Sequence, residues 1–274
     1  MTGSVRTGVV APRWQPDQQE RICIVIPAYD EAATIGEIVR RCRAALPSAS
    51  VIVVNDGSCD NTGEIAAHSG ATVLCHPANQ GKGASLMEGM RAAMAGGAAR
   101  VVTLDGDGQH RPEDLPRLLA CSRAWPGHIV LGSRRASGRA APRVRFIANR
   151  VADFWISWAA RHPLDDSQCG FRVYPAQLVR LIAARPRLAN GFAFESELLI
   201  EAGRMGFRTV SVAIPTIYGN GLRRPSHFRP VADVTRIVLM VAGKLLARGM
   251  DPVGLWRSLT LRRLRDSSRH AAVD

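Results

Sequence analysis

The chain alternates short, almost wholly apolar runs with longer stretches in which apolar residues recur every three or four positions. Runs of the first kind predict strands that are buried on both faces, and they cover 22–26, 51–54, 71–74, 101–104 and 129–131. Stretches of the second kind lie between them and predict helices, at roughly thirty residues per strand and helix. The pattern therefore predicts an α/β fold in which helices flank a Rossmann-like sheet.

The second half of the chain is less regular. A basic helix rich in Trp and Phe is expected within 140–161, and another helix starts near 192. A strand is expected over 207–214, and a last long helix follows Arg229. The C-terminal helices are expected to be amphipathic. Two interpretations of 140–161 stay open: a segment that lies at a membrane interface, or a helix packed on the core with its arginines in water.

The domain organisation follows from the same pattern. Residues 20–250 are expected to form one domain. A disordered arm over 1–19 would precede it, and a basic tail over 251–274 would follow it. Because the part of the tail over 257–269 is rich in arginine, we expect it to be loosely structured.

Polar residues gather where the predicted strands end. Asp105 and Asp107 follow the strand over 101–104 with one glycine between them, and Gln109 comes just after. In an extended backbone, residues two apart project to the same side, so the two carboxylates can converge on one cation. Oxygen ligands suit Mg²⁺ or Mn²⁺, which share their coordination with substrate phosphates. An isolated Asp-Gly-Asp is also a common polar turn, so the interpretation depends on the neighbouring motifs.

Two familiar nucleotide-binding motifs are excluded. A Walker A loop has the pattern GxxxxGK[ST]. Before Gly81-Lys82 its first glycine is replaced by His76, and Gly83 replaces the Ser or Thr. The dinucleotide fingerprint GxGxxG fails as well, because Arg111 stands where the third glycine is required.

The net charge indicates an anionic partner, and the cysteine pattern indicates a reducing compartment. The net charge of +13 points to nucleic acid, a phosphorylated substrate or an acidic membrane surface. The six cysteines are scattered without a CxxC pair, which is typical of free thiols in a reducing cytosol. The first twenty residues lack the pattern of a signal peptide. No stretch reaches the roughly 18 apolar residues that a membrane span needs, so a cytoplasmic protein is expected.

The ordered loops resemble those of the family 2 glycosyltransferases with the GT-A (nucleotide-diphospho-sugar transferase) fold, especially the dolichyl- or polyprenyl-phosphate mannose and glucose synthases. The similarity extends over about 21–240 and consists of IVIPAYDEAATI, VVNDGSCDNT, NQGKGAS, LDGDGQHRPED, LGSRR, DSQCGFR, FESELL and RRPSHFR. Each motif is weak alone, and the ordered set is specific. The resemblance implies a metal-dependent, inverting enzyme that moves a hexose from a GDP- or UDP-sugar to a polyprenyl phosphate. Such an enzyme would work at the inner face of the cytoplasmic membrane, with 140–161 docked on the anionic surface.

The resemblance also implies roles for individual residues. Asp56 would accept a hydrogen bond from the base and Asp60 would support the loop. The base and ribose would be lined by Pro27, Tyr29 and Glu31. The sugar diphosphate would lie near Lys82, Asp105, Arg134, Ser226, His227 and Arg229. A Mg²⁺ or Mn²⁺ ion would be bound by Asp105, Asp107 and Gln109. Asp107 and Arg134 would also assist catalysis, because the departing diphosphate must be neutralised.

The acceptor decides whether a general base is needed. A lipid phosphate is ionised near neutral pH, whereas a hydroxyl on another lipid, a glycan or a small metabolite must lose a proton to a carboxylate. Asp166, Glu195 and Glu197 are the candidates for that base, although both glutamates are equally typical of helix N-termini. A third hypothesis is a basic nucleic-acid-binding module. The chain has no recognised motif for it, and phosphate substrates explain the charge, so no nucleic-acid partner is expected.

Overall fold

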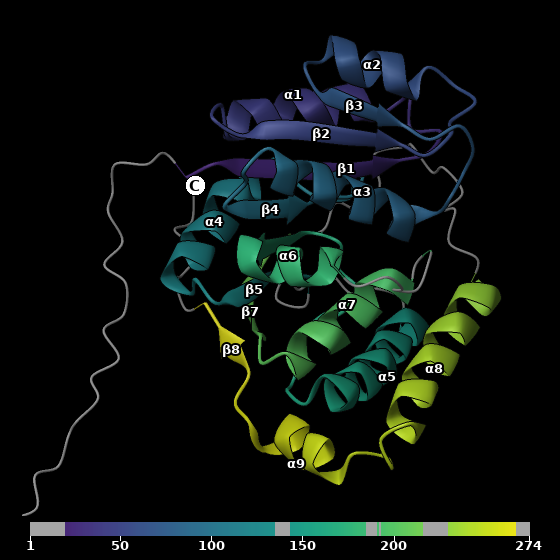
Figure 1. Cartoon of the computed structure of the whole chain (residues 1–274), viewed down its shortest axis with the longest axis vertical. Coiled ribbons are helices and arrows are strands. Elements are labelled where there is room, and N and C mark those ends of the chain that lie inside the picture. The colour runs from purple at the N-terminus through teal and green to yellow at the C-terminus, as the bar shows by residue number, and fades with distance from the viewer. Residues whose placement is uncertain (1–19, 135–142, 185–190, 192, 216–229, 267–274) are drawn as a thin grey trace, which may run out of the picture.

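The computed structural model describes residues 20–134, 143–184, 191, 193–215 and 230–266, which form one mixed sheet with helices on both faces (Figure 1). The first half contains β1 (Ile22–Ala28), α1 (Ile35–Ala45), β2 (Ser50–Asn55), α2 (Thr62–His68), β3 (Thr72–Cys75), α3 (Lys82–Ala95), β4 (Arg100–Thr103), the 3-10 turn Pro112–Asp114, α4 (Leu115–Ala124) and β5 (His128–Ser133). The second half contains α5 (Arg143–Ala160), β6 (Arg172–Pro175), α6 (Ala176–Ala183), α7 (Ala193–Arg204), β7 (Arg208–Ala213), α8 (Pro230–Leu246), α9 (Pro252–Thr260) and β8 (Leu264–Arg265).

The strands follow the order β3-β2-β1-β4-β6-β5-β7-β8. Every neighbouring pair is parallel except the two that involve β6, which runs antiparallel to both β4 and β5. The parallel strands of the first half therefore end at one edge of the sheet, and their loops converge there. This edge is where ligands bind in open α/β sheets.

The near-continuous apolar run of β1 reflects burial on both faces. Cys23 and Val25 belong to one core cluster, which also contains residues of α3, α6 and α7. Ile24 and Ile26 point to the other face and belong to a second cluster, with residues of α1 and α4. This alternation is what a period of two produces in a strand, so the two layers of helices pack on alternate apolar residues of the same strand.

The strand and helix predictions are confirmed for most of the chain. Strands form at the five apolar runs and within 207–214, and α7 and α8 form where helices are expected. The helix expected within 140–161 is α5, and its described part combines features of both interpretations. Ile156 and Trp158 are buried in the core, whereas Phe154 and Trp155 are each about 40% exposed.

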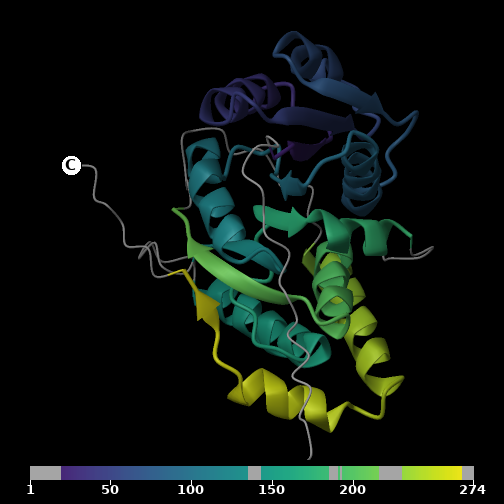
Figure 2. The same cartoon turned by 60° about the vertical axis from the view of Figure 1, so that its left-hand side comes forward.

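Two features differ from the sequence-based picture. The polar turn at 165–171 leads into β6, whose antiparallel place between β4 and β5 the apolar pattern does not reveal. The prediction of loose structure over 257–269 is wrong for the residues up to Asp266. Helix α9 is capped by the Asp251 carboxylate, which accepts from the backbone N of Gly254 at 3.0 Å, and β8 pairs with β7. Figure 2 shows α9 at the end of the molecule opposite β3.

Two further sequence expectations concern cysteines and membrane spans. All six cysteines are free; Cys59 and Cys75 are exposed and the other four are buried. Among the described residues, no helix is both long and apolar enough to cross a membrane. The expected disordered arm lies outside the described residues.

Candidate active site

The loops after β1 and β2 hold each other at the edge of the sheet. The backbone N of Glu31 donates to Thr62 Oγ1 at 2.8 Å, and the backbone N of Asp30 donates to Ser58 Oγ at 3.0 Å. Asp60 links the two loops, because it accepts from the backbone N of Ala32 at 3.1 Å and from the backbone N of Thr62 at 3.0 Å. These are the contacts of a loop-supporting carboxylate. Pro27, Tyr29 and Glu31 lie partly exposed along this edge.

The Asp105 carboxylate lies where the loop after β4 meets the loop before β6. Gly170 comes so close that a Cβ atom there would lie 2.6 Å from Asp105 Oδ2, so any other residue would displace the Asp105 carboxylate. Thr103 of β4 donates its hydroxyl to the Gly170 carbonyl at 2.8 Å, which fixes this approach. His110 Nε2 lies 3.8 Å from Asp105 Oδ2 on another side.

Lys82, the first residue of α3, bridges two acidic side chains next to this loop. Its Nζ lies 2.7 Å from Asp105 Oδ1 and 2.7 Å from Glu195 Oε2, at the start of α7. Burial alone would lower the pKa of Lys82, but the two carboxylates raise it above its ordinary value. Burial likewise raises the pKa of Asp105, and the Lys82 charge outweighs this and holds it well below its usual range. The bridge therefore joins three separate segments around an ionised Asp105.

Asp107 is the accessible carboxylate of the pair. Its side chain is exposed, and its Oδ1 accepts from the backbone N of Gln109 at 3.0 Å. Partial desolvation of the carboxyl by the surrounding loop and the negative charge of Asp105 raise the pKa of Asp107. Within the described ranges, no cluster of three or more His, Cys, Asp or Glu residues could hold a metal. The donor set fits a hard divalent ion that takes its remaining ligands from phosphate and water.

Asp56, in the loop after β2, is buried, with 3% of its surface exposed. Its Oδ2 accepts from the backbone N of Gly81 at 2.8 Å, and its Oδ1 accepts from the backbone N of Gln80 at 2.9 Å. The carboxylate thereby fixes the segment that leads into Lys82. Gly57, the next residue, has φ +71° and packs against the backbone of Ala78 so closely that a side chain would clash.

Arg134 and Asp166 form a bidentate ion pair beside the site. Arg134 donates through Nε and Nη2 at 2.8 and 2.7 Å, and its backbone N adds a bond of 2.9 Å to the same carboxylate. Asp166 is 4% exposed, with a φ of 56°, and its neighbour Asp165 accepts from Ser133 at 3.4 Å. Both residues expected to serve phosphate binding or catalysis here are therefore paired with each other.

The two candidate bases on α7 have different surroundings. Glu195 contacts Lys82, and its Oε1 is a buried oxygen without a hydrogen-bond partner. Glu197 instead contacts Lys244 of α8, with Oε1 at 2.7 Å from Nζ. The structure thus brings Glu195 to Asp105 and turns Glu197 toward a helix–helix contact. A role for Glu197 as a base stays a prediction.

Arg172 is a residue of this region that the sequence-based roles omit. Its guanidinium is fully buried and donates to the carbonyls of Cys169 at 2.6 Å, Ser167 at 2.8 Å and Glu195 at 3.0 Å. Burial would lower the pKa of Arg172, but Tyr174 and Glu195 raise it. It holds the 165–171 loop against the start of α7. The Arg of the Cys-Gly-Phe-Arg motif, placed after a polar turn, is the signal that could have identified it.

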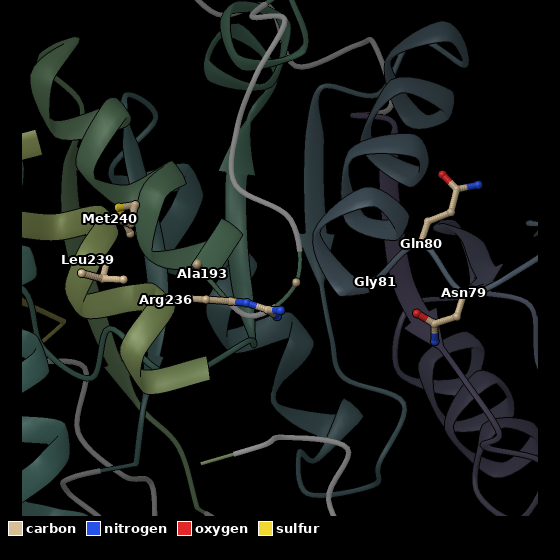
Figure 3. Close-up of a pocket in the computed structure, with 8 residues that line it drawn as sticks. Asn79, Gln80, Gly81, Ala193, Arg236, Leu239 and Met240 are labelled. Carbon is tan, nitrogen blue, oxygen red and sulfur yellow. The ribbon is translucent and has the colours of Figure 1, made fainter. Parts of the chain in front are cut away.

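A cavity of about 600 Å³ opens next to Lys82 (Figure 3). Arg236 extends from α8 across it toward the segment that holds Gly81. The lining residues are Asn79, Gln80, Gly81, Gly191, Ala193, Arg236, Leu239 and Met240. The expected phosphate-binding residues Ser226, His227 and Arg229 lie outside the described residues.

The comparisons with known proteins decide the family. The model described as glycosyl transferase family 2 matches residues 23–169, more than half of the chain. The chain is a family 2 glycosyltransferase. Its sheet and flanking helices are those of the GT-A fold.

An undecaprenyl-phosphate mannosyltransferase and a polyprenol monophosphomannose synthase are among the curated relatives of this glycosyltransferase. It is 33% identical over 207 residues to the undecaprenyl-phosphate mannosyltransferase of Micrococcus luteus, over 71% of this chain and 82% of that one. It is 29% identical over 204 residues to the polyprenol monophosphomannose synthase of Mycolicibacterium smegmatis, over 71% and 77%. Among solved structures, the glucosyl-3-phosphoglycerate synthase of Mycobacterium tuberculosis with Mn²⁺, UDP and phosphoglyceric acid matches with a TM-score of 0.61 at 23% identity. That match covers 84% of this chain and 78% of the other.

Proposed function

We propose that this glycosyltransferase moves a hexose from a GDP- or UDP-sugar to the phosphate of a polyprenyl lipid, with inversion at the anomeric carbon. The observation that carries the proposal is the arrangement of Asp107, Asp105 and Lys82 at the carboxyl ends of the parallel strands. An exposed carboxylate lies there beside a partly buried acid–lysine bridge, where a sugar diphosphate would bind. The names of the curated relatives support the lipid-phosphate acceptor.

The reaction breaks the bond between the anomeric carbon and the diphosphate and forms a bond from that carbon to an acceptor oxygen. Asp107, with Asp105 and Gln109, would hold Mg²⁺ or Mn²⁺, which neutralises the leaving diphosphate. Lys82 and Arg134 are the cations that stand beside it and stabilise the same charge electrostatically. Tyr29, Pro27 and Glu31 would line the base and ribose.

An ionised phosphate acceptor fits the surroundings of the candidate bases. The carboxylates of Glu195 and Asp166 already contact Lys82 and Arg134, at 2.7 Å each for the shortest ion-pair distances. A hydroxyl acceptor would require one of them to leave its cation and take a proton. A phosphate acceptor needs no such step, so the lipid phosphate is the favoured substrate.

The acceptor would approach through the cavity of Figure 3. Arg236 offers a cation to the phosphate, and Leu239 and Met240 offer apolar contacts to the first isoprene units. Val238, Leu239 and Leu246 of α8 are more than half exposed, as are Trp256 and Leu259 of α9. Together with the exposed arginines 248, 257 and 262, these residues would contribute to peripheral docking on an anionic bilayer. We place the enzyme at the inner face of the cytoplasmic membrane.

The test is an assay with purified protein, Mn²⁺ or Mg²⁺, and GDP-mannose, UDP-glucose and other sugar nucleotides. Each donor is offered with a short polyprenyl phosphate, with the corresponding alcohol, or with neither, and the free nucleoside diphosphate and the glycolipid are measured. We expect metal-dependent glycolipid only from the phosphate, and a loss of about a hundredfold or more in Asp107→Ala. Glu37→Gln, which changes an exposed acid of α1, is the matched control. Transfer to the alcohol alone would overturn the phosphate acceptor.

A further inference from the structure

His76, just after β3, is a buried titratable residue that the proposed reaction does not use. Its side chain is 4% exposed and lies between two acids. Nδ1 is 2.6 Å from Asp56 Oδ1, in the loop after β2, and Nε2 is 2.5 Å from Glu88 Oε2, on α3. These carboxylates are the charged groups that face the ring within the described part of the chain.

The hydrogen-bond geometry around His76 indicates that its ring is positively charged. A neutral imidazole has one N–H, whereas an ionised carboxylate oxygen only accepts hydrogen bonds. The carboxylate oxygens of Asp56 and Glu88 can both accept a hydrogen bond from the ring only when both ring nitrogens carry a proton. Burial lowers the pKa of His76, but the hydrogen bonds to Asp56 and Glu88 outweigh it and raise the pKa above its ordinary value.

The ring acts on the residue expected to contact the donor's base. A carboxylate has about four lone-pair positions, and Asp56 uses three of them for His76, Gln80 and Gly81. The remaining position is on Oδ2. Gln80 and Gly81 lead directly into Lys82, so the same contacts also set the start of α3 beside Asp105.

We propose that cationic His76 is a positioning residue of the donor site. It fixes the Asp56 carboxylate so that one oxygen position faces an N–H of the donor's base, and it makes donor binding weaken at alkaline pH. The inference rests on the proposed function, because it takes Asp56 as the base-binding residue of a sugar-nucleotide site.

The sign of the pH effect follows from the direction of the shift. When the ring loses a proton, one carboxylate faces a nitrogen lone pair, and the orientation of Asp56 is no longer fixed. Because the folded-state pKa lies above the ordinary value, binding is strongest below the raised pKa and falls as pH rises through it. The stability that the charged ring contributes is present below the unfolded-state pKa and is lost over the same alkaline range.

The experiment measures binding of UDP and GDP with Mn²⁺ by calorimetry from pH 6 to 9, together with KM and kcat for the donor. We expect His76→Gln to raise the dissociation constant about tenfold or more at pH 7, because a charge-assisted hydrogen bond is lost, and to abolish the alkaline fall. The value of kcat should change little. His68→Gln, an exposed histidine of α2 bonded to its own helix, is the matched control.

Glu88→Gln keeps the size of its side chain and provides a second variant should His76→Gln fail to fold. It should move the alkaline fall to lower pH while binding at pH 6 is kept. Nitrogen NMR of the ring gives a readout that needs no donor: both ring nitrogens should be protonated at pH 7. A neutral ring, or a pH profile unchanged in both variants, would overturn the inference. Absence of nucleotide binding by the wild-type protein would instead overturn the proposed function.

Discussion

The two lysines of the chain occupy similar chemical environments in different regions. Lys82 bridges Asp105 and Glu195, and Lys244 bridges Glu197 and Glu201, with all four distances between 2.6 and 2.7 Å. Lys82 joins α3, the loop after β4 and the start of α7, at the edge where the parallel strands end. Lys244 joins only α7 and α8, away from that edge.

The two lysines therefore differ in position and not in chemical surroundings. Glu195 and Glu197 are two residues apart on α7, so at 3.6 residues per turn their side chains leave the helix in nearly opposite directions. One meets Asp105 and the other meets α8. Four substitutions test this difference.

The largest effect is expected for Lys82→Met. It removes a cation from beside the proposed diphosphate position and takes the shared partner from Asp105 and Glu195, so kcat/KM should fall by roughly 10²–10³-fold. Steady-state kinetics with saturating metal measures the loss, and thermal unfolding monitors the fold. Retention of activity within a few fold would remove Lys82 from the site.

Lys244→Met should affect stability and spare the chemistry. The bonds of Lys244 to Glu197 and Glu201 join α7 to α8, so their loss should lower the free energy of unfolding by about 1–2 kcal/mol. Urea unfolding followed by circular dichroism gives this quantity, and kcat should stay within about twofold. A fall in kcat comparable with that of Lys82→Met would show that the two bridges are functionally alike.

The smallest effect is expected for Glu197→Gln, because Lys244 keeps Glu201 as a partner. Stability should change by less than about 1 kcal/mol, with kcat unchanged. Glu195→Gln, made in parallel, should lower activity through its contact with Lys82. If Glu197→Gln instead lowered kcat by about a hundredfold, Glu197 would be the general base and a hydroxyl acceptor would be favoured.

The first half of the fold could be predicted from sequence because β1, β2 and β4 are buried on both faces and read as continuous apolar runs. The loops after them contain the polar residues of the site, so Asp105, Asp107 and Asp56 could be identified before their geometry was known. β6 could not be placed in the same way, because its four residues carry no period and include the buried Arg172.

The ion-pair partners of the site residues could not be predicted from the sequence either. Asp166 and Glu195 could be named as acids near the site, but their cations, Arg134 and Lys82, come from distant parts of the chain. In the sequence, His76 is notable only because it stands where a Walker A loop requires its first glycine. Its role depends on two carboxylates, 20 residues before it and 12 after it, that only the fold brings together. The arginine-rich tail is predicted to be loose because of its charge. Its two residue pairs with β7 leave no pattern in the sequence from which they could be predicted.

The place of β6 between β4 and β5 has a consequence for biosynthesis. Strands β1 to β4 are neighbours within residues 22–103, so this part of the sheet can acquire its partners as soon as it leaves the ribosome. β5 is made next, yet both of its partners, β6 and β7, are made later. β6 follows first, and the pairing with β7 requires some eighty residues of further chain, the distance from His128 to Arg208. The half of the sheet that contains β1 to β4 can therefore form early, and the half that contains β5 to β7 is completed last.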